Sequence, residues 1–543
     1  MKKFTPTFLL IFAYSILFAQ SRDKIAMKFA ATITVEDAKK HLSVLASDEY
    51  EGRETGKEGQ KKAAKYIEEY FKKTGLAPAR VAGEELKSEK ENGYLQKFPL
   101  VLSTPESAVL KVNDTTYENL KDFYFLPFGN DLILEAKEIL FLGYGISDEK
   151  YDDYKNTDVK DKIILVLGGE PLDKDSVSII TGTQESSEWT NNRRKKANFA
   201  KSKNAAALII VKSDFEESIQ KIKEYLETPS LKLKPDKEET AKTSSYEGNK
   251  IPQLGITINM ANAILYSQKI TVDNIQQKIS TTKAPLSLQL KSSFELTIKN
   301  KEENLDSENV LGMIEGGELK EEVVFVTAHY DHLGVRDGKV FNGADDDGSG
   351  TVGIMEIAEA FAKAKKAGFT PKRSLVFMAT SGEEKGLLGS SYYTENPIFR
   401  IENTVCDLNI DMIGRIDDEH KDSVNYVYII GSDKISTDLH KINEKANAIY
   451  TNLKLNYKYN DENEPNRFYY RSDHYNFAKK GIPIIFYFNG THEDYHKETD
   501  EISKINFDLL TKRAQLVFYT AWEVANRKER IKSDVPQEKP NKQ

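Results

Sequence analysis

Segments rich in His, Asp and Glu follow β-like apolar runs in the second half of this chain, and this alternation constrains the fold more than any other feature. Apolar runs at 323–328, 374–380 and 405–410 each lead into such a segment, and a run at 482–488 lies shortly before another. The segments are 327–332, 342–350, 381–384, 409–412 and 495–500. In an open α/β sheet, ligands bind at the carboxyl ends of the strands. The sequence therefore predicts an α/β fold in which these segments converge on one crevice.

These segments contain enough donors for two divalent ions that lie close together. Such a pair needs one bridging carboxylate, and a His and a carboxylate to complete each side. Asp346 can bridge, and His329 with Asp411 can complete one side. His496 with Glu384 can complete the other side. This donor set favours zinc, although carboxylate-rich sites also accept cobalt or manganese.

Two further carboxylates suggest catalysis at such a site. Glu383 adjoins Glu384, and because consecutive side chains cannot both point at one ion, Glu383 is free to accept a proton from a metal-bound water. Asp331 stands two residues beyond His329, where it could hold the second nitrogen of the imidazole. The pattern is typical of a two-metal hydrolase.

The ordered set of motifs resembles that of the M28 metallopeptidases, the di-zinc aminopeptidases with a phosphorylase/hydrolase-like fold. The resemblance extends from about residue 42 to about residue 526, with an insertion. It implies a mixed, mostly parallel sheet that is covered by helices on both faces. The family's metal ligands fall at His329, Asp346, Glu384, Asp411 and His496.

The same resemblance assigns roles to four other residues. The general base falls at Glu383, and Asp331 matches the carboxylate that supports the first His ligand. Asp347 matches the residue after the bridging Asp, which is commonly joined to it by a cis peptide bond. Tyr495 matches a tyrosine that in some members helps to polarise the scissile carbonyl.

Each motif also has an ordinary structural explanation when it is taken alone. Asp and Gly dominate turns, and an acidic pair is favoured at a helix N-terminus. These explanations would have to hold independently and still fall in the family's order, so we favour the metal site. His332, His474 and His492 only flank the motifs, and we assign them no metal role, although His474 could line the substrate pocket.

Composition limits the other classes of function. The chain has 543 residues, of which 39% are hydrophobic and 30% charged, as expected of a soluble globular protein with two or three domains. Its net charge of −8 is spread without a basic stripe, which argues against a nucleic-acid partner. Cys406 is the single cysteine, so we expect no internal disulfide and a small buried side chain in a strand.

The N-terminus predicts export. Lys2 and Lys3 precede an apolar stretch at 8–18, and Ala19 offers a cleavage point, so residues 1–19 are interpreted as a signal peptide. A membrane anchor that stays attached is the alternative. No later segment has 18 consecutive apolar residues. We therefore expect a periplasmic or secreted protein that is not inserted in a membrane after the signal is removed.

The rest of the chain divides into segments of different character. Periodic apolar residues predict helices at Val35–Leu45 and 59–73 in an N-terminal peptidase part, 20–104. Strand-like runs at 138–146, 162–167, 205–211 and 251–256 resemble an inserted, mainly β protease-associated domain at 105–283. The catalytic part is expected at 284–531, with helices at 349–366 and 507–524, before a disordered tail at 532–543. Residues 212–246 are polar and predict an exposed excursion or a mobile loop.

The expected activity is hydrolysis of the N-terminal peptide bond of peptides with a free α-amine, with two zinc ions per chain. Three alternatives stay open. A glutaminyl-cyclase-like enzyme would use one zinc, a dipeptidase or carboxypeptidase would differ in end preference, and a receptor-like relative would lack chemistry. The sequence leaves the oligomeric state undetermined.

Overall fold

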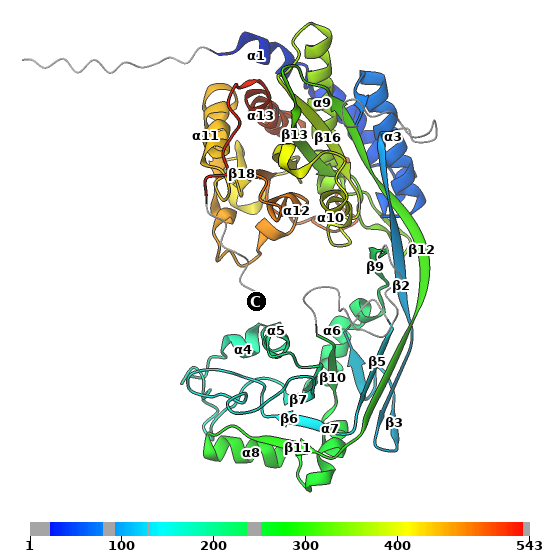
Figure 1. Cartoon of the computed structure of the whole chain (residues 1–543), viewed down its shortest axis with the longest axis vertical. Helices are drawn as coiled ribbons and strands as arrows, with labels where there is room; N and C mark the ends of the chain where they lie inside the picture. The colour runs from blue at the N-terminus through cyan, green and yellow to red at the C-terminus, as the bar shows by residue number, and fades with distance from the viewer. Residues whose placement is uncertain (1–21, 80–92, 127–130, 193, 236–250, 536–543) are drawn as a thin grey trace, which may run out of the picture. The chain divides into compact units, whose positions relative to one another are not determined.

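A computed structural model describes residues 22–79, 93–126, 131–192, 194–235 and 251–535, which belong to two compact units (Figure 1). The first unit contains the chain up to residue 97 and residues 307–537, and the second contains residues 98–306. The expected signal peptide, 1–19, and most of the expected tail lie outside the described residues. The predicted insertion, 105–283, falls within the second unit, and its identity as a protease-associated domain stays a prediction.

The first unit is built on the mixed, mostly parallel sheet that the sequence predicts. Its central order is β18-β20-β17-β13-β16-β12. The parallel strands are β13 (Leu319–His329), β16 (Arg373–Thr380), β17 (Thr404–Ile410) and β20 (Ile484–Phe488). Antiparallel strands flank them: β18 (Tyr426–Ile430), which pairs with β19 (Lys454–Asn456), and the last part of β12 (Phe294–Ile314), whose residues 310–314 pair with β16.

Helices cover both faces of this sheet, because successive side chains of the strands point to opposite faces. In β13, Val324 and Val326 join one apolar cluster, and Val323 and Phe325 join another. The first face is covered by α1 (Lys24–Ala30), α2 (Val35–Leu45), α3 (Glu58–Thr74), α9 (Gly350–Lys366), α11 (Thr437–Ala446) and α13 (Phe507–Asn526). The second face is covered by α10 (Leu388–Glu395) and α12 (His474–Ala478).

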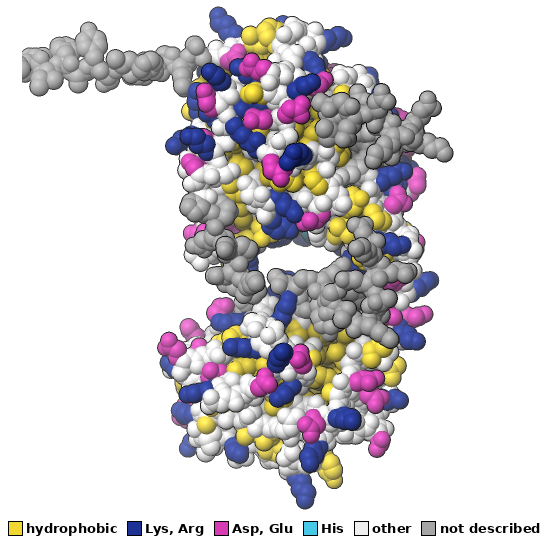
Figure 2. Space-filling view, viewed as in Figure 1, with side chains coloured by type: hydrophobic (Ala, Val, Ile, Leu, Met, Phe, Trp, Pro, Cys, Tyr) yellow, Lys and Arg dark blue, Asp and Glu magenta, His cyan; other side chains and the backbone are white. Residues whose placement is uncertain are grey.

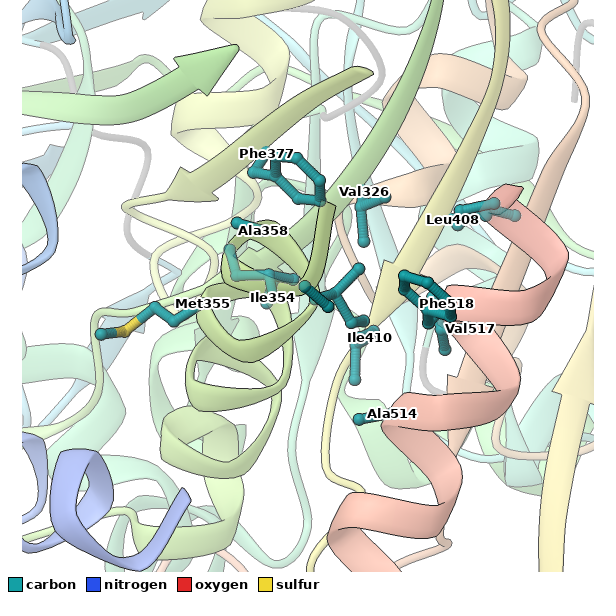
Figure 3. Close-up of a cluster of buried hydrophobic side chains, with 14 of the residues drawn as sticks. Val326, Ile354, Met355, Ala358, Phe377, Leu408, Ile410, Ala514, Val517 and Phe518 are labelled. Atoms are coloured by element: carbon teal, nitrogen blue, oxygen red, sulfur yellow. The ribbon is translucent and has the colours of Figure 1, made fainter. Parts of the chain in front are cut away.

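Helix α9 is buried on two sides, and its position fixes the loop that precedes it. Ile354 and Ala358 face the strands and α13, while Met355 points to another side (Figure 3). That other side contacts the N-terminal helices, including α2 and α3. The helix begins directly after the 344–349 segment, so its packing holds the predicted bridging carboxylate at the carboxyl ends of the strands.

The second unit has a smaller six-stranded sheet of order β11-β6-β7-β8-β10-β4. These strands are β4 (Phe123–Phe125), β6 (Ile139–Leu142), β7 (Ile163–Leu167), β8 (Ala207–Val211), β10 (Gln253–Ile256) and β11 (Ser287–Leu290). Its helices are α4 (Glu188–Asn191), α5 (Lys195–Ser202), α6 (Phe215–Glu227), α7 (Ile258–Leu265) and α8 (Val272–Thr282). On the face drawn in Figure 2, basic and acidic side chains are interspersed over the surface of each unit.

One expectation for this unit was wrong. Residues 212–246 were expected to be an excursion or a loop, but their described part contains α6 and β9 (Ser230–Leu233). Phe215 and Leu226 are buried, and Ile219 and Ile222 pack against them at helical spacing. Four apolar residues on one helical face therefore outweigh the polar composition of the segment. Residues 236–250 lie outside the described part.

Two smaller expectations can also be compared with the structure. Cys406 is buried in β17, which confirms its prediction as a small apolar side chain in a strand. Within the described ranges, no helix is long and apolar enough to cross a membrane.

Candidate metal centre

The predicted ligands meet at the carboxyl ends of the parallel strands. His329 is the last residue of β13, and Asp411 directly follows β17. Glu383 and Glu384 lie in the turn after β16. His496 lies in the segment after β20. Residues far apart in the sequence thus reach one place because parallel strands end at the same edge of the sheet.

The carboxylate of Asp346 lies between the two histidines. Its Oδ1 is 3.3 Å from His329 Nε2, and its Oδ2 is 3.1 Å from His496 Nε2. Asp411 Oδ1 lies 3.7 Å from His329 Nε2, and Glu384 Oε2 lies 3.3 Å from His496 Nε2. Two donors on one tetrahedral zinc, with bonds of about 2.0–2.1 Å, are separated by about 3.3 Å. The spacing of these atoms is therefore suited to a metal on each side of Asp346.

Buried oxygen atoms without hydrogen bonds support this fit. The side chains of Asp346 and Glu384 are only 4% and 5% exposed. Asp346 Oδ2 and Glu384 Oε1 accept no hydrogen bond of regular geometry among the described residues; each instead has an imidazole nitrogen nearby, His496 Nε2 at 3.1 Å and His332 Nδ1 at 2.7 Å. A buried carboxylate oxygen that is neither solvated nor hydrogen-bonded is costly unless a cation satisfies it. The donor set of imidazole and carboxylate is one that zinc accepts.

Glu383 lies beside this group but is held differently. Its Oε2 is 3.9 Å from His329 Nε2, and its backbone N–H donates to Asp331 Oδ1 at 3.2 Å. Burial raises the pKa of the Glu383 carboxyl well above its usual value, and the negative charge of Asp411 adds to this increase. His329, Glu383 and Asp411 are close enough for one ion to contact all three.

Asp331 supports the centre in a way that differs from the expectation. Its backbone carbonyl, rather than its carboxylate, lies 3.0 Å from His329 Nδ1. The carboxylate Oδ1 is 3.7 Å from that nitrogen. The carboxylate accepts a hydrogen bond from Thr55 Oγ1 through Oδ2, at 2.6 Å, and one from the backbone N–H of Glu383 through Oδ1. Asp331 therefore orients His329 through its backbone and Glu383 through its side chain.

His332, to which the sequence assigned no metal role, lies in this centre. Its ring is fully buried, and its Nδ1 is 2.7 Å from Glu384 Oε1 and 3.9 Å from Asp346 Oδ2. His332, Asp346 and Glu384 form a second group that one ion could contact. Sequence position did not predict this placement, because β13 ends at His329 and His332 lies beyond its alternating pattern, in an isolated bridge with Glu54.

The other two flanking histidines have structural contacts. His492 Nε2 lies 3.2 Å from Asp345 Oδ2, next to the bridging position. His474 is buried behind Phe486, with ring centroids 4.7 Å apart, and its Nε2 lies 2.8 Å from Tyr469 O. Burial lowers the pKa of His474 to about 3, as expected of a neutral core imidazole. Among the described residues, Phe486 lines the cavity described below and His474 does not, so the expectation that His474 could line the substrate pocket is not met.

Arg53 holds the backbone around the centre, a role that sequence reasoning missed. Its side chain is buried, and its guanidinium donates to Tyr330 O at 2.8 Å, Asn342 O at 2.7 Å and Gly343 O at 2.9 Å. It also donates to Leu45 O at 2.6 Å, at the end of α2. Four carbonyl groups from three parts of the chain are thus fixed by one planar group. An Arg in a Gly-rich turn gives no periodic signal from which this could be inferred.

Two acidic residues fix the segment that carries Asp346. The carboxylate of Asp500 accepts hydrogen bonds from the backbone N–H groups of Asp345 and Asp346, at 3.0 and 3.1 Å. Asp347 Oδ1 accepts from Gly350 N and Met412 N, both at 2.9 Å. The peptide bond between Asp346 and Asp347 is cis, as the family resemblance implies.

A cavity of about 30 Å³ opens beside the metal centre. Its polar side is formed by residues of the centre, and its apolar side includes Met412, Phe468 and Phe488. Tyr495 also lines it, with its ring stacked on His496 at 3.9 Å and its hydroxyl oxygen 3.3 Å from Arg471 Nη2. The cavity can therefore place a small group against both carboxylates and aromatic rings.

Comparison with known proteins agrees with this geometry. Residues 309–521 match the model of Peptidase family M28, and this segment contains all the predicted metal ligands. A probable glutamate carboxypeptidase from Arthroderma benhamiae is 38% identical over 105 residues, which cover 19% of this chain and 14% of that relative. Aminopeptidase YwaD from Bacillus subtilis is 32% identical over 113 residues, 20% of this chain and 23% of that relative. Two Pyrenophora relatives are named probable zinc metalloproteases.

A solved structure shares the fold over nearly the whole chain. The aminopeptidase from Aneurinibacillus sp. strain AM-1 is 18% identical, and the match covers 94% of this chain and 98% of that one with a TM-score of 0.51. The predicted fold class, a mixed sheet with helices on both faces, is thereby confirmed. By contrast, the matched segments span less than a quarter of the two relatives described above from A. benhamiae and B. subtilis.

Proposed function

We propose that this chain is a zinc-dependent aminopeptidase that removes N-terminal residues from peptides, with Glu383 as the general base. The observation that carries the proposal is the Asp346 carboxylate, which lies between two His–carboxylate groups with Glu383 beside them. The family match of residues 309–521 and the peptidase names of the relatives support it.

The chain offers ligands for two zinc ions on either side of Asp346. His329 and Asp411 would complete one set. His496 and Glu384 would complete the other, with His332 close to Glu384. Bound zinc would lower the pKa of the attacking water and polarise the scissile carbonyl.

The chain's own residues supply the proton transfers and the orientation. Glu383 accepts the proton of the attacking water and later delivers it to the leaving amine. The carboxylate of Asp331 keeps Glu383 in place by accepting a hydrogen bond from the backbone N–H of Glu383. The hydroxyl of Tyr495, which lines the cavity, can donate a hydrogen bond to the carbonyl oxygen as negative charge develops.

The charge of the cavity favours recognition of an amine. Asp346, Glu383 and Asp411 all contribute to its lining. In the zinc-loaded protein the charges of Asp346 and Asp411 would be balanced by the ions, so Glu383 is the acidic lining residue left to attract a free α-amino group. An acetylated N-terminus has lost that positive charge, so an aminopeptidase with this site should reject it.

A carboxypeptidase is the second candidate. A relative that is 38% identical over 105 residues is named a probable glutamate carboxypeptidase. Arg471 also lines the cavity and could bind a carboxylate with its guanidinium. With Asp346 and Asp411 assigned to zinc, Glu383 and Arg471 are the remaining acidic and basic lining residues that the structure describes apart from His496; we favour the aminopeptidase because the relative from B. subtilis is named an aminopeptidase.

Product analysis decides between these candidates. Zinc-loaded protein is incubated with peptides that have free or acetylated N-termini, and mass spectrometry identifies the products. We expect sequential loss of single residues from the free N-terminus and no cleavage of the acetylated copies.

Other products would establish another activity. Cleavage from the C-terminus regardless of acetylation would establish a carboxypeptidase, and hydrolysis of dipeptides alone would establish a dipeptidase. Loss of ammonia from N-terminal Gln with every peptide bond intact would establish a cyclase, and no reaction at all would favour a binding protein.

We also propose that the protein is exported after removal of residues 1–19. The basic residues, the apolar stretch and Ala19 support this proposal. N-terminal sequencing of the protein from the periplasm or medium should begin near Gln20. Recovery of intact Met1 from salt-washed membranes would instead establish a retained anchor.

A further inference from the structure

A second group of acidic side chains lies between α2 and α9, outside the metal centre. Asp37 and His41 are four residues apart on α2, and Glu356 and Glu359 are three residues apart on α9. Residues at these spacings share one face of a helix. Oxygen atoms of Asp37, Glu356 and Glu359 lie within 4.8 Å of one another. The two helices therefore direct three carboxylates toward one point.

Glu356 is the central member of this group and lacks a partner for one oxygen. Its side chain is 0% exposed, and its Oε2 accepts a long hydrogen bond of 3.4 Å from the backbone of Thr34. Its Oε1 is buried and has no hydrogen-bond partner within the described part of the chain. The nearest basic atom is His41 Nε2, at 4.0 Å, which is too far for a hydrogen bond. A buried charge in this state is unfavourable without a cation.

His41 adds an imidazole to the group. It is 6% exposed, and its Nδ1 is 2.8 Å from the hydroxyl oxygen of Tyr66, which leaves Nε2 directed toward Glu356. A ring whose second nitrogen has a hydrogen-bond partner is the usual arrangement of a metal-binding histidine. The imidazole therefore lies beside Glu356, outside the three carboxylates whose oxygen atoms lie within 4.8 Å of one another.

The charges around the group do not neutralise Glu356. Lys363 Nζ donates to Glu359 Oε2 at 2.7 Å, which leaves the other oxygen of Glu359 available. Burial lowers the pKa of His41, and the charges of Lys40 and Lys73 lower it further, whereas Asp37 and Glu359 act in the opposite direction. Burial, followed by the charge of Asp37, raises the pKa of Glu356 to about 8. The region is thus short of positive charge at the point where Glu356 Oε1 lies.

We propose that Asp37, His41, Glu356 and Glu359 form a divalent-cation site that fastens α2 to α9. Three carboxylates and one imidazole suit zinc or manganese better than magnesium, which prefers oxygen and water. Glu356 is six residues beyond Gly350, the start of α9, or about 9 Å along the helix axis. The ion is therefore distinct from those of the metal centre and acts on stability.

Metal stoichiometry tests the site in the full-length chain. The protein is stripped with a chelator, loaded with Zn²⁺ or Mn²⁺, dialysed and measured for metal per chain and for Tm. We expect Asp37→Asn with Glu359→Gln to bind about one ion fewer than wild type and to lose part of the metal-dependent rise in Tm. Glu36→Gln, an exposed charge change on the same helix, should match wild type.

A second background separates this ion from those of the metal centre. In an Asp346→Asn protein, the remaining bound ion should still disappear when Glu359→Gln is added. Unchanged metal content in both backgrounds would overturn the proposal and leave Glu356 as a protonated core acid. If the double variant at Asp37 and Glu359 fails to fold, the single substitution Glu359→Gln decides by the same measurement. Peptidase activity is not used, so failure of the proposed function would leave this test intact.

Discussion

The metal centre and the α2–α9 cluster both bring His and carboxylates together in buried surroundings, but they are built differently. The centre draws its residues from the carboxyl ends of parallel strands and borders a cavity. The cluster lies on two helices that pack against each other. In the centre, Asp331, Asp500 and Arg53 hold the surrounding chain in place. The cluster has one long backbone hydrogen bond to its central carboxylate.

This difference in construction predicts that the metal centre serves catalysis and that the cluster serves the stability of the fold. A site that must orient a substrate needs supported ligands and space for the reacting group. A site that only joins two helices needs neither. We therefore expect substitutions in the centre to change activity and metal content together, and substitutions in the cluster to change only metal content and stability.

The largest effect is expected from Asp346→Ala. Because Asp346 faces both histidines, its loss removes a ligand from both proposed metal positions. Metal analysis should show loss of both ions of the centre, and no peptidase activity should remain. The ion of the cluster should be retained. An Asp346→Ala protein that still hydrolyses peptides would exclude Asp346 as the bridge.

Glu383→Gln should abolish most activity while the metals stay bound. A neutral amide cannot accept the proton of the attacking water, so kcat should fall by about 10²–10⁴-fold. Metal content and Tm should stay near wild type. The matched control is Glu359→Gln, the same substitution in the cluster, which should leave kcat unchanged. Near-normal turnover of Glu383→Gln would mean that another group is the base.

Arg53→Met should weaken the support of the centre. Methionine fills much of the space but leaves four carbonyl groups without their donor. We expect the free energy of unfolding to fall by about 3 kcal/mol and the affinity for zinc by about 10–100-fold. Denaturant titration and metal competition measure the two effects. Arg400→Met, at an exposed position, should show neither.

Sequence reasoning succeeded where the pattern is local. The helix at Val35–Leu45 has the predicted bounds, and α9 and α13 begin within one residue of prediction. The strands that precede the ligands were found because they are continuous apolar runs. Those runs, together with the rule that ligands gather at strand ends, were enough to bring the predicted ligands together.

Contacts that depend on tertiary packing could not be predicted in this way. Arg53 reaches Gly343 across 290 positions of sequence, and no local pattern identifies that partner. His332 follows the end of a strand, where alternation no longer indicates which way a side chain points. Glu356 falls on a helix face that packs against the N-terminal helices, and helical periodicity alone does not indicate that a Glu there is buried.

The smallest effect concerns the pH dependence of the cluster in metal-free protein. The pKa of Glu356 is raised to about 8 in the folded state, mainly by burial, so the folded protein binds more protons than the unfolded chain between about pH 4.5 and 8. Stability should therefore fall as pH rises through this window, and the fall should end once pH has passed about 8. His41, Asp37, Glu359 and Lys363 also face the cluster, so wild type is compared with Glu356→Gln, in which only this carboxyl is removed. In chelator, the stability of the variant should depend less on pH than that of wild type. At pH 8, added Zn²⁺ should restore the stability of the wild-type protein and should stabilise the variant less. Identical pH profiles of the two proteins would mean that Glu356 is already neutralised without a metal.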